Sequence, residues 1–176
     1  MFKPLSIAAI LLVALAGSAF AQASPPASAS VTIGGKTVSI KYSAPSVRGR
    51  KIFGDGGLLS RDPTYPAWRG GANAATAFHT DANLDFAGLV VPRGNYTLYI
   101  WVKDPEAWQL IISKQTGQWG DTYTASQDLG RVRMTMSRPP AAVETMKYIL
   151  TDKGGGKGEL RLEWERHVAA VPIALR

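Results

Sequence analysis

The strongest constraint on the fold of this chain is a period-two alternation of side chains that recurs along most of its length. Successive side chains of a β-strand point to opposite faces, so alternation is typical of strands with one buried and one wetted face. Five segments carry it, with apolar positions Val38, Ile40 and Tyr42; Tyr96, Leu98, Ile100 and Val102; Val132, Met134 and Met136; Met146, Tyr148 and Leu150; and Leu160, Leu162 and Trp164. After the N-terminal segment, no comparable stretch repeats apolar residues at helical spacing. The alternation predicts an all-β fold.

Glycine- and proline-containing turn signals separate these segments. They fall at residues 34–35, 92–94, 103–106 and 154–158, and the Gly-Gly pair at 34–35 is typical of a tight hairpin. Short strands at this spacing predict an antiparallel β-sandwich, jelly-roll or immunoglobulin-like, of roughly nine or ten strands about 5–6 residues long. Residues 54–72 lack any period, and a connection of that length is typical of a functional or mobile loop.

The N-terminus has the three parts of a cleaved signal peptide. Lys3 supplies the positive charge, Leu5–Ala16 the apolar segment, and Ala19 and Ala21 the small residues before the cleavage site. The apolar run is shorter than the roughly 20 residues that span a bilayer, so we expect no transmembrane segment in the mature form. The protein is predicted to be periplasmic or secreted.

The chain therefore divides into three parts. Residues 1–21 are the predicted signal peptide, and residues 22–30, which are small, polar and proline-bearing, a flexible linker. Residues 31–176 form a single predicted β-sandwich domain.

Residue usage excludes several kinds of chemistry. The absence of cysteine excludes disulfides, thiolate metal sites and cysteine nucleophiles. With only two histidines, His79 and His167, we expect no metal site and no cofactor. Ser43, His79 and Asp81 suggest a hydrolase triad, but no Gly-x-Ser-x-Gly elbow supports one. No catalytic residue is assigned, and the protein is expected not to be an enzyme.

The net charge points to anionic partners. Twenty Lys and Arg residues against thirteen Asp and Glu residues give a formal charge of +7. A basic exported protein is attracted to anionic polymers, so an anionic glycan or another acidic envelope ligand is the expected partner, rather than nucleic acid. The basic residues are scattered, which leaves open both a focused patch and a generally basic surface. The oligomeric state is not predicted.

Two segments combine cations, glycines and an indole ring in a way that suits ligand binding. Arginine forks and an indole face recognise carboxylates, phosphates and sugars. The candidate ligand-binding residues are Arg48, Arg50, Lys51, Trp68, Arg69 and Asn73. We expect them to meet at one end of the sandwich, with Trp68 stacking on a sugar. The alternative is architectural: the arginines bind loop carbonyls and Trp68 fills the core.

The same segments resemble a family of secreted bacterial proteins, the domain of unknown function 2911. The resemblance runs from about Val38 to Ile173. Its motifs correspond to Tyr42–Gly54, Trp68–Thr76, Pro92–Leu98, Trp119-Gly120 and Trp164. The resemblance implies a β-sandwich and export, and it implies no activity.

Two positions depart from the family pattern. Gly70 replaces a hydroxyl residue and Ala74 replaces a glutamate, so any acid chemistry of that glutamate is lost here. We therefore expect an exported envelope protein that binds acidic or carbohydrate ligands. The alternatives are a structural or assembly protein, or a hydrolase acting on envelope material.

Overall fold

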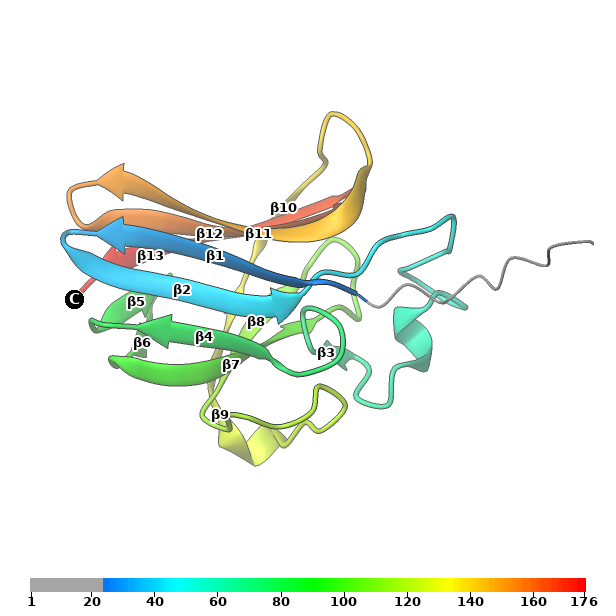
Figure 1. Ribbon diagram of the computed structural model, residues 1–176, viewed down its shortest axis with the longest axis horizontal. Helices are drawn as coiled ribbons and strands as arrows, with labels where there is room; N and C mark the ends of the chain where they lie inside the picture. Colours follow the sequence, from blue (N-terminus) through cyan, green and yellow to red (C-terminus); the bar gives the residue numbers. More distant parts are fainter. Residues whose placement is uncertain (1–23) are drawn as a thin grey trace, which may run out of the picture.

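The computed structural model describes residues 24–176 as two antiparallel β-sheets packed face to face (Figure 1). The predicted all-β sandwich is confirmed, and the sheets do not close into a barrel. The predicted signal peptide, residues 1–21, lies outside the described residues. Within residues 24–176, no helix has the length and apolar character needed to cross a membrane.

The first sheet has seven strands. Its order is β1 (Pro26–Ile33), β2 (Lys36–Ser43), β4 (Thr76–Thr80), β7 (Gly94–Trp101), β8 (Gln109–Ser113) and β9 (Asp128–Arg133), and β3 (Ala67–Trp68) pairs with β7. The predicted hairpin at Gly34 and Gly35 joins β1 to β2. Both glycines have positive φ, 51° and 78°, a conformation that favours glycine.

The second sheet has six strands. Its order is β11 (Val143–Gly154), β12 (Lys157–Glu165), β13 (His167–Leu175), β5 (Leu84–Phe86) and β6 (Leu89–Val91), and β10 (Thr135–Ser137) pairs with β13. Two short 3-10 helices, η1 (Leu59–Arg61) and η2 (Ala125–Gln127), lie in the loops. The described residues thus form thirteen strands rather than nine or ten, because several of the additional strands are only two or three residues long.

The core between the sheets is built from the predicted inward-facing side chains. Ile40 and Leu98 of the seven-stranded sheet and Leu160 and Leu162 of the six-stranded sheet are fully buried in one cluster. The hydrophobic effect of burying these alternating residues holds the two layers together.

The predicted flexible linker is wrong where the structure describes it, because β1 begins at Pro26 rather than at Val31. Every residue of β1 pairs with β2, from Pro26 opposite Ser43 to the hairpin. Ala27 and Ala29 pack against the core, so small side chains carried the alternation there without a strong apolar signal. A proline at the first residue of an edge strand costs no ladder hydrogen bond.

The outer face of β7 also differs from the prediction. Thr97 and Tyr99 were expected to face water, yet both are buried. The chain that follows β8 folds back over them: the Tyr99 hydroxyl donates to the Thr122 carbonyl at 2.6 Å, and Gln118 Nε2 donates to Thr97 Oγ1 at 3.2 Å. This loop, which follows β8 and which we call the returning loop, covers part of the outer face of the sheet.

Candidate functional site

Four of the six predicted binding residues meet at the loop end of the sandwich. Arg50, Trp68, Arg69 and Asn73 line a cavity of about 300 Å³. Arg50 also lines an adjoining hollow of about 310 Å³ together with Lys51. Two segments far apart in sequence are therefore brought together as expected, although ligand binding there stays a prediction.

Trp68 is a core residue. Its side chain is 1 % exposed and stacks on Trp164 of β12, with ring centroids 5.4 Å apart and planes 23° from parallel. Its indole N–H donates to the Gly71 carbonyl at 3.1 Å. Both faces are used inside the protein, so the predicted stacking of a sugar on Trp68 does not fit the structure. Trp68 therefore fits the architectural alternative, in which its side chain fills the core.

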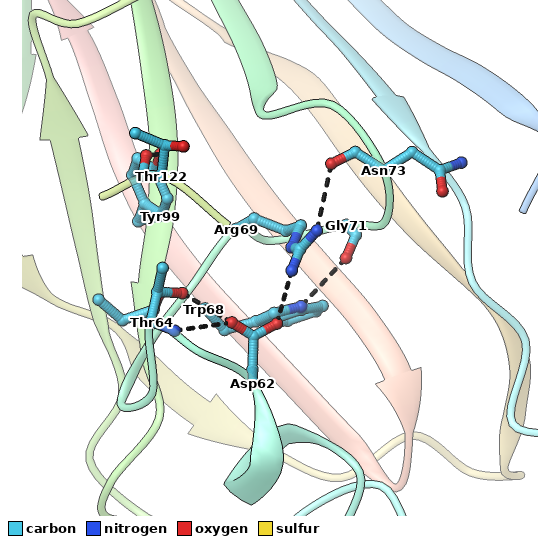
Figure 2. Close-up of polar contacts among 9 residues, drawn as sticks. Asp62, Thr64, Trp68, Arg69, Gly71, Asn73, Tyr99 and Thr122 are labelled. Carbon is cyan, nitrogen blue, oxygen red and sulfur yellow. Dashed lines mark hydrogen bonds and ion pairs between the residues drawn. The ribbon is translucent and has the colours of Figure 1, made fainter. Parts of the chain in front are cut away.

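Arg69 joins two loops (Figure 2). Its Nη2 donates to Asp62 Oδ2 at 2.9 Å and its Nη1 donates to the Asn73 carbonyl at 3.2 Å. The other oxygen of Asp62 accepts from the backbone and the hydroxyl of Thr64. Gly120 packs so closely that a Cβ there would lie 2.4 Å from Arg69 Cδ. The charge of Arg69 is compensated and its position fixed, which suits a structural role.

The three cations of the first segment are exposed but hold their own loop. Arg50 donates to the carbonyls of Ser46 and Val47 at 2.6 and 3.1 Å. Lys51 Nζ donates to the Asp55 carbonyl, and the backbone N–H of Arg48 donates to a Glu144 carboxylate oxygen. Carbonyls do not neutralise charge, so the formal positive charges of these three side chains are not compensated by an ion pair within residues 24–176.

A larger cavity, of about 650 Å³, lies on the outer face of the seven-stranded sheet. Its floor is Ala77 of β4, which pairs with Lys41 of β2 on one side and Thr97 of β7 on the other. Because residues two apart share a face, His79 stands next to Ala77 along β4. A methyl group surrounded by longer side chains leaves a groove, which we call the Ala77 groove. Its polar lining residues are Ser39, Lys41, His79, Asn95, Thr97, Thr116 and Gln118.

His79 is held by an acceptor on each ring nitrogen. Nε2 lies 2.9 Å from Asp81 Oδ1, and Nδ1 lies 2.8 Å from Asn95 Oδ1. The hydrogen bond to Asp81, followed by that to Asn95, raises the pKa of His79 above its usual value. The hydrogen bonds from His79 and Thr37 lower the pKa of Asp81. The arrangement favours an imidazolium that donates two hydrogen bonds.

This geometry limits the triad hypothesis. His79 has a carboxylate within hydrogen-bond distance and an adjoining groove, as a hydrolase needs. Both ring nitrogens are occupied, however, and among the hydrogen bonds of the described residues no hydroxyl contacts this histidine. Ser43 is not in contact with it either. A general base needs a free nitrogen within reach of the proton it takes.

Gln118 forms part of one wall of the groove, and Trp119 follows it in the chain. Gln118 Nε2 donates to Thr97 Oγ1 and to the Tyr99 hydroxyl, and its Oε1 has no hydrogen-bond partner within residues 24–176. Trp119 is 56 % exposed and pairs by backbone with Ala74, which also lines the groove. The Trp119 side chain is not among the residues that line the groove.

Sequence reasoning named His79 only as a doubtful triad member and did not assign Lys41, Asn95 or Gln118. The alternation placed Lys41 and Thr97 on outward faces, and this was the only sequence signal that could have pointed to the groove. The register that sets them on either side of Ala77 is a tertiary property.

The described part of the chain contains no cluster of three His, Cys, Asp or Glu side chains that could hold a metal ion. The two histidines lie in different surroundings. His79 borders the groove, whereas His167 stacks on Trp108 with ring centroids 5.1 Å apart.

Comparison with known proteins gives one match. The family model described as "Protein of unknown function (DUF2911)" matches residues 24–173. The comparisons with curated proteins and with solved structures found no match.

Proposed function

This chain belongs to the DUF2911 family of proteins of unknown function, and we propose that it is a non-enzymatic carbohydrate-binding protein of the bacterial envelope whose site is the Ala77 groove. The single observation that carries the proposal is the ring of hydroxyl, amide and cationic side chains around one small residue. A cleft with a few convergent polar groups is the usual form of a small-molecule site.

The chemistry of the lining suits a sugar. Ser39 offers a hydroxyl and Asn95 offers its amide N–H₂ group, and both can exchange hydrogen bonds with sugar hydroxyls.

The basic loop end supports the anionic side of the proposal. Arg48, Arg50 and Lys51 are exposed and make no ion pair with any described residue. The electric field of these three cations attracts an acidic polymer to the protein surface, although the cations themselves lie outside the groove. This attraction weakens as added salt screens the charges.

The test fills the groove without removing any polar group. Ala77→Phe places a ring on an exposed strand position, where the fold can accommodate it. Ala142→Phe, at an exposed loop position outside the groove, is the matched control. On a panel of immobilised envelope polysaccharides, we expect the wild type and Ala142→Phe to bind alike and Ala77→Phe to lose about tenfold or more in affinity, the equivalent of about 1.4 kcal/mol. Equal binding by all three proteins would place the site elsewhere.

A hydrolase using the same groove is the second candidate, favoured by the contact between His79 and Asp81. Its test is release of reducing ends from the polysaccharide that binds. Release by the wild type that disappears in His79→Gln would establish catalysis and replace the binding proposal. Binding without release supports the module.

A further inference from the structure

The geometry of the groove points to a sugar residue bearing one carboxylate, a uronate, as its ligand, with the carboxylate held between Lys41 and Asn95. This inference rests on the proposed function and names the ligand class of the same site. It depends on three features of the groove: the position of its lysine, the orientation of its asparagine and its sum of charges.

Lys41 is positioned to meet an anion at the groove floor. It is directly opposite Ala77 across the β2–β4 pair, and His79 stands one position further along the same face of β4. Asn95 lies on β7, on the other side of β4 from Lys41, so their backbones are separated by two strand spacings of roughly 4.8 Å each and by a two-residue offset. The long lysine side chain and a ligand carboxylate can bridge this gap together. Lys41 is exposed and makes no ion pair within residues 24–176. Its ammonium group is available to a ligand.

Asn95 supplies the second donor. Its Oδ1 lies 2.8 Å from His79 Nδ1, so the protonated imidazole fixes which end of the amide faces the histidine. The amide N–H₂ group is then directed away from the ring, and it has no partner among the hydrogen bonds of the described residues. His79 itself donates to Asp81 and Asn95, so it contributes positive charge and orientation rather than a direct contact.

The charge of the groove matches a monoanion. Lys41 and protonated His79 are the two cations facing this part of the sheet, from β2 and β4, and Asp81 is the acid beside them. Neither Asn95 on β7 nor the polar residues 116–118 of the overhanging loop titrate near neutral pH. The sum is +1 with His79 protonated and zero with it neutral. This sum matches the single charge of a carboxylate more closely than the charge of about −1.5 to −2 that a phosphate monoester carries at neutral pH.

The charge sum also makes recognition depend on pH. The pKa of His79 is raised because its protonated form donates to Asp81 and Asn95. As the pH rises through that pKa, the groove loses its net positive charge and Asn95 loses the donor that orients it. The ligand carboxylate stays ionised throughout, because ordinary carboxyl pKa values lie well below that of histidine. Uronate binding therefore weakens with rising pH, whereas binding of an uncharged sugar does not.

The experiment compares each acidic glycan with its own neutral form. Polygalacturonate, alginate and hyaluronate oligomers are titrated calorimetrically against their methyl esters, at about pH 5.5 and about pH 8.5, on either side of the usual histidine pKa. We expect the wild type to prefer at least one acid over its ester by about tenfold or more at the lower pH, the effect of one charge-assisted contact. Lys41→Gln should lose that preference, and His79→Gln should lose its pH dependence. Lys103→Gln removes an exposed lysine outside the groove and should behave as the wild type.

The outcomes separate the two proposals. Wild-type protein that binds the esters as tightly as the acids, or that prefers sulfated oligomers, overturns the carboxylate assignment while leaving sugar binding intact. An acid preference that survives in Lys41→Gln also overturns it. If the wild type binds none of these oligomers, or if Ala77→Phe binds as the wild type does, the proposed function itself fails.

Discussion

Gly70 occupies a position that tolerates no side chain. Its φ is 57°, and a Cβ there would lie 2.3 Å from the Tyr148 hydroxyl oxygen. The same hydroxyl donates to the Gly70 carbonyl at 2.9 Å, and complete burial raises the pKa of Tyr148. The departure from the family pattern at Gly70 is thus coupled to a buried tyrosine on the opposite sheet.

This coupling gives a prediction about stability. Gly70→Thr should lower the free energy of unfolding by about 2 kcal/mol or more, because it combines positive-φ strain with a collision. Tyr148→Phe alone should cost about 1 kcal/mol for its lost hydrogen bond. Urea unfolding of the double variant should show a cost smaller than the sum, since removing the hydroxyl removes the collision. Strict additivity would show that the two residues are not coupled.

His167 is the second residue-scale feature, and its titration acts opposite to that of His79. Burial against Trp108 and Phe53 lowers the pKa of His167, while nearby Glu165 partly offsets the shift. The unfolded chain therefore binds a proton near pH 6.5 before the folded chain does. The stability that neutral His167 contributes is present above that pH and is lost as the pH falls through the folded pKa. For His79 the raised pKa gives stability below about pH 6.5 that is lost as the pH rises.

We therefore expect His167→Phe to flatten the acid side of the stability profile. The substitution keeps an aromatic ring on Trp108 and removes the titrating group. Chemical unfolding measured from about pH 7.5 to about pH 5, across the usual histidine pKa, should show a weaker decline for the variant than for the wild type. His79→Gln should steepen that decline, because the stabilising protonation is lost. Parallel profiles for the three proteins would contradict this assignment.

At the scale of elements, β1 shows how a strand can form from small residues. Ala27, Ala29 and Val31 pack against the core, while Ser28 and Ser30 face outward. This half-buried edge strand contributes packing on one face only. A charged side chain introduced on the inward face should lower the free energy of unfolding, whereas one on the outward face should change it little.

The substitutions Ala29→Asp and Ser28→Asp test this arrangement, because they place the same charge at neighbouring positions on opposite faces of β1. We expect Ala29→Asp to lower the free energy of unfolding by about 1–3 kcal/mol, since it buries an unpaired carboxylate. Ser28→Asp should change it by no more than about 0.5 kcal/mol. Equal effects in thermal and urea unfolding would mean that residues 26–30 do not pack as a strand.

The strands that the sequence predicts well are those with one wet face. The segments around Ile40 and Leu162 alternate because water contacts one side, and their inward positions are buried as expected. β13 was not predicted, although its burial alternates: Ala169 and Val171 are buried, whereas Ala170 and Pro172 are more exposed. These outward residues are not polar, so the sequence shows no apolar–polar alternation there. The period-two pattern is visible only where the outward residues are polar, so a strand whose outward positions are alanine and proline carries little of that signal.

At the scale of the whole molecule, the sequence analysis correctly predicted that the segments containing Arg50 and Trp68 lie close together. It predicted the roles of their residues only in part. Arg50 and Trp68 do border one cavity, as two loops at one end of a sandwich should. Residue type alone does not separate an arginine that holds a loop, such as Arg69, from one that holds a ligand. The Ala77 groove was out of reach because three strands and a returning loop build it, and their register is set only by tertiary packing.

The central place of β13 in its sheet has a consequence for how the molecule assembles. β13 alone joins the β11–β12 hairpin to the β5–β6 pair, which is otherwise a two-stranded ribbon of marginal stability (Figure 1). Within the six-stranded sheet, residues 84–91 therefore gain a further neighbouring strand only when residues 167–175 pair with them. Such distant pairing slows closure of the sandwich, because the conformational entropy of bringing these two segments together is lost before their pairing stabilises them.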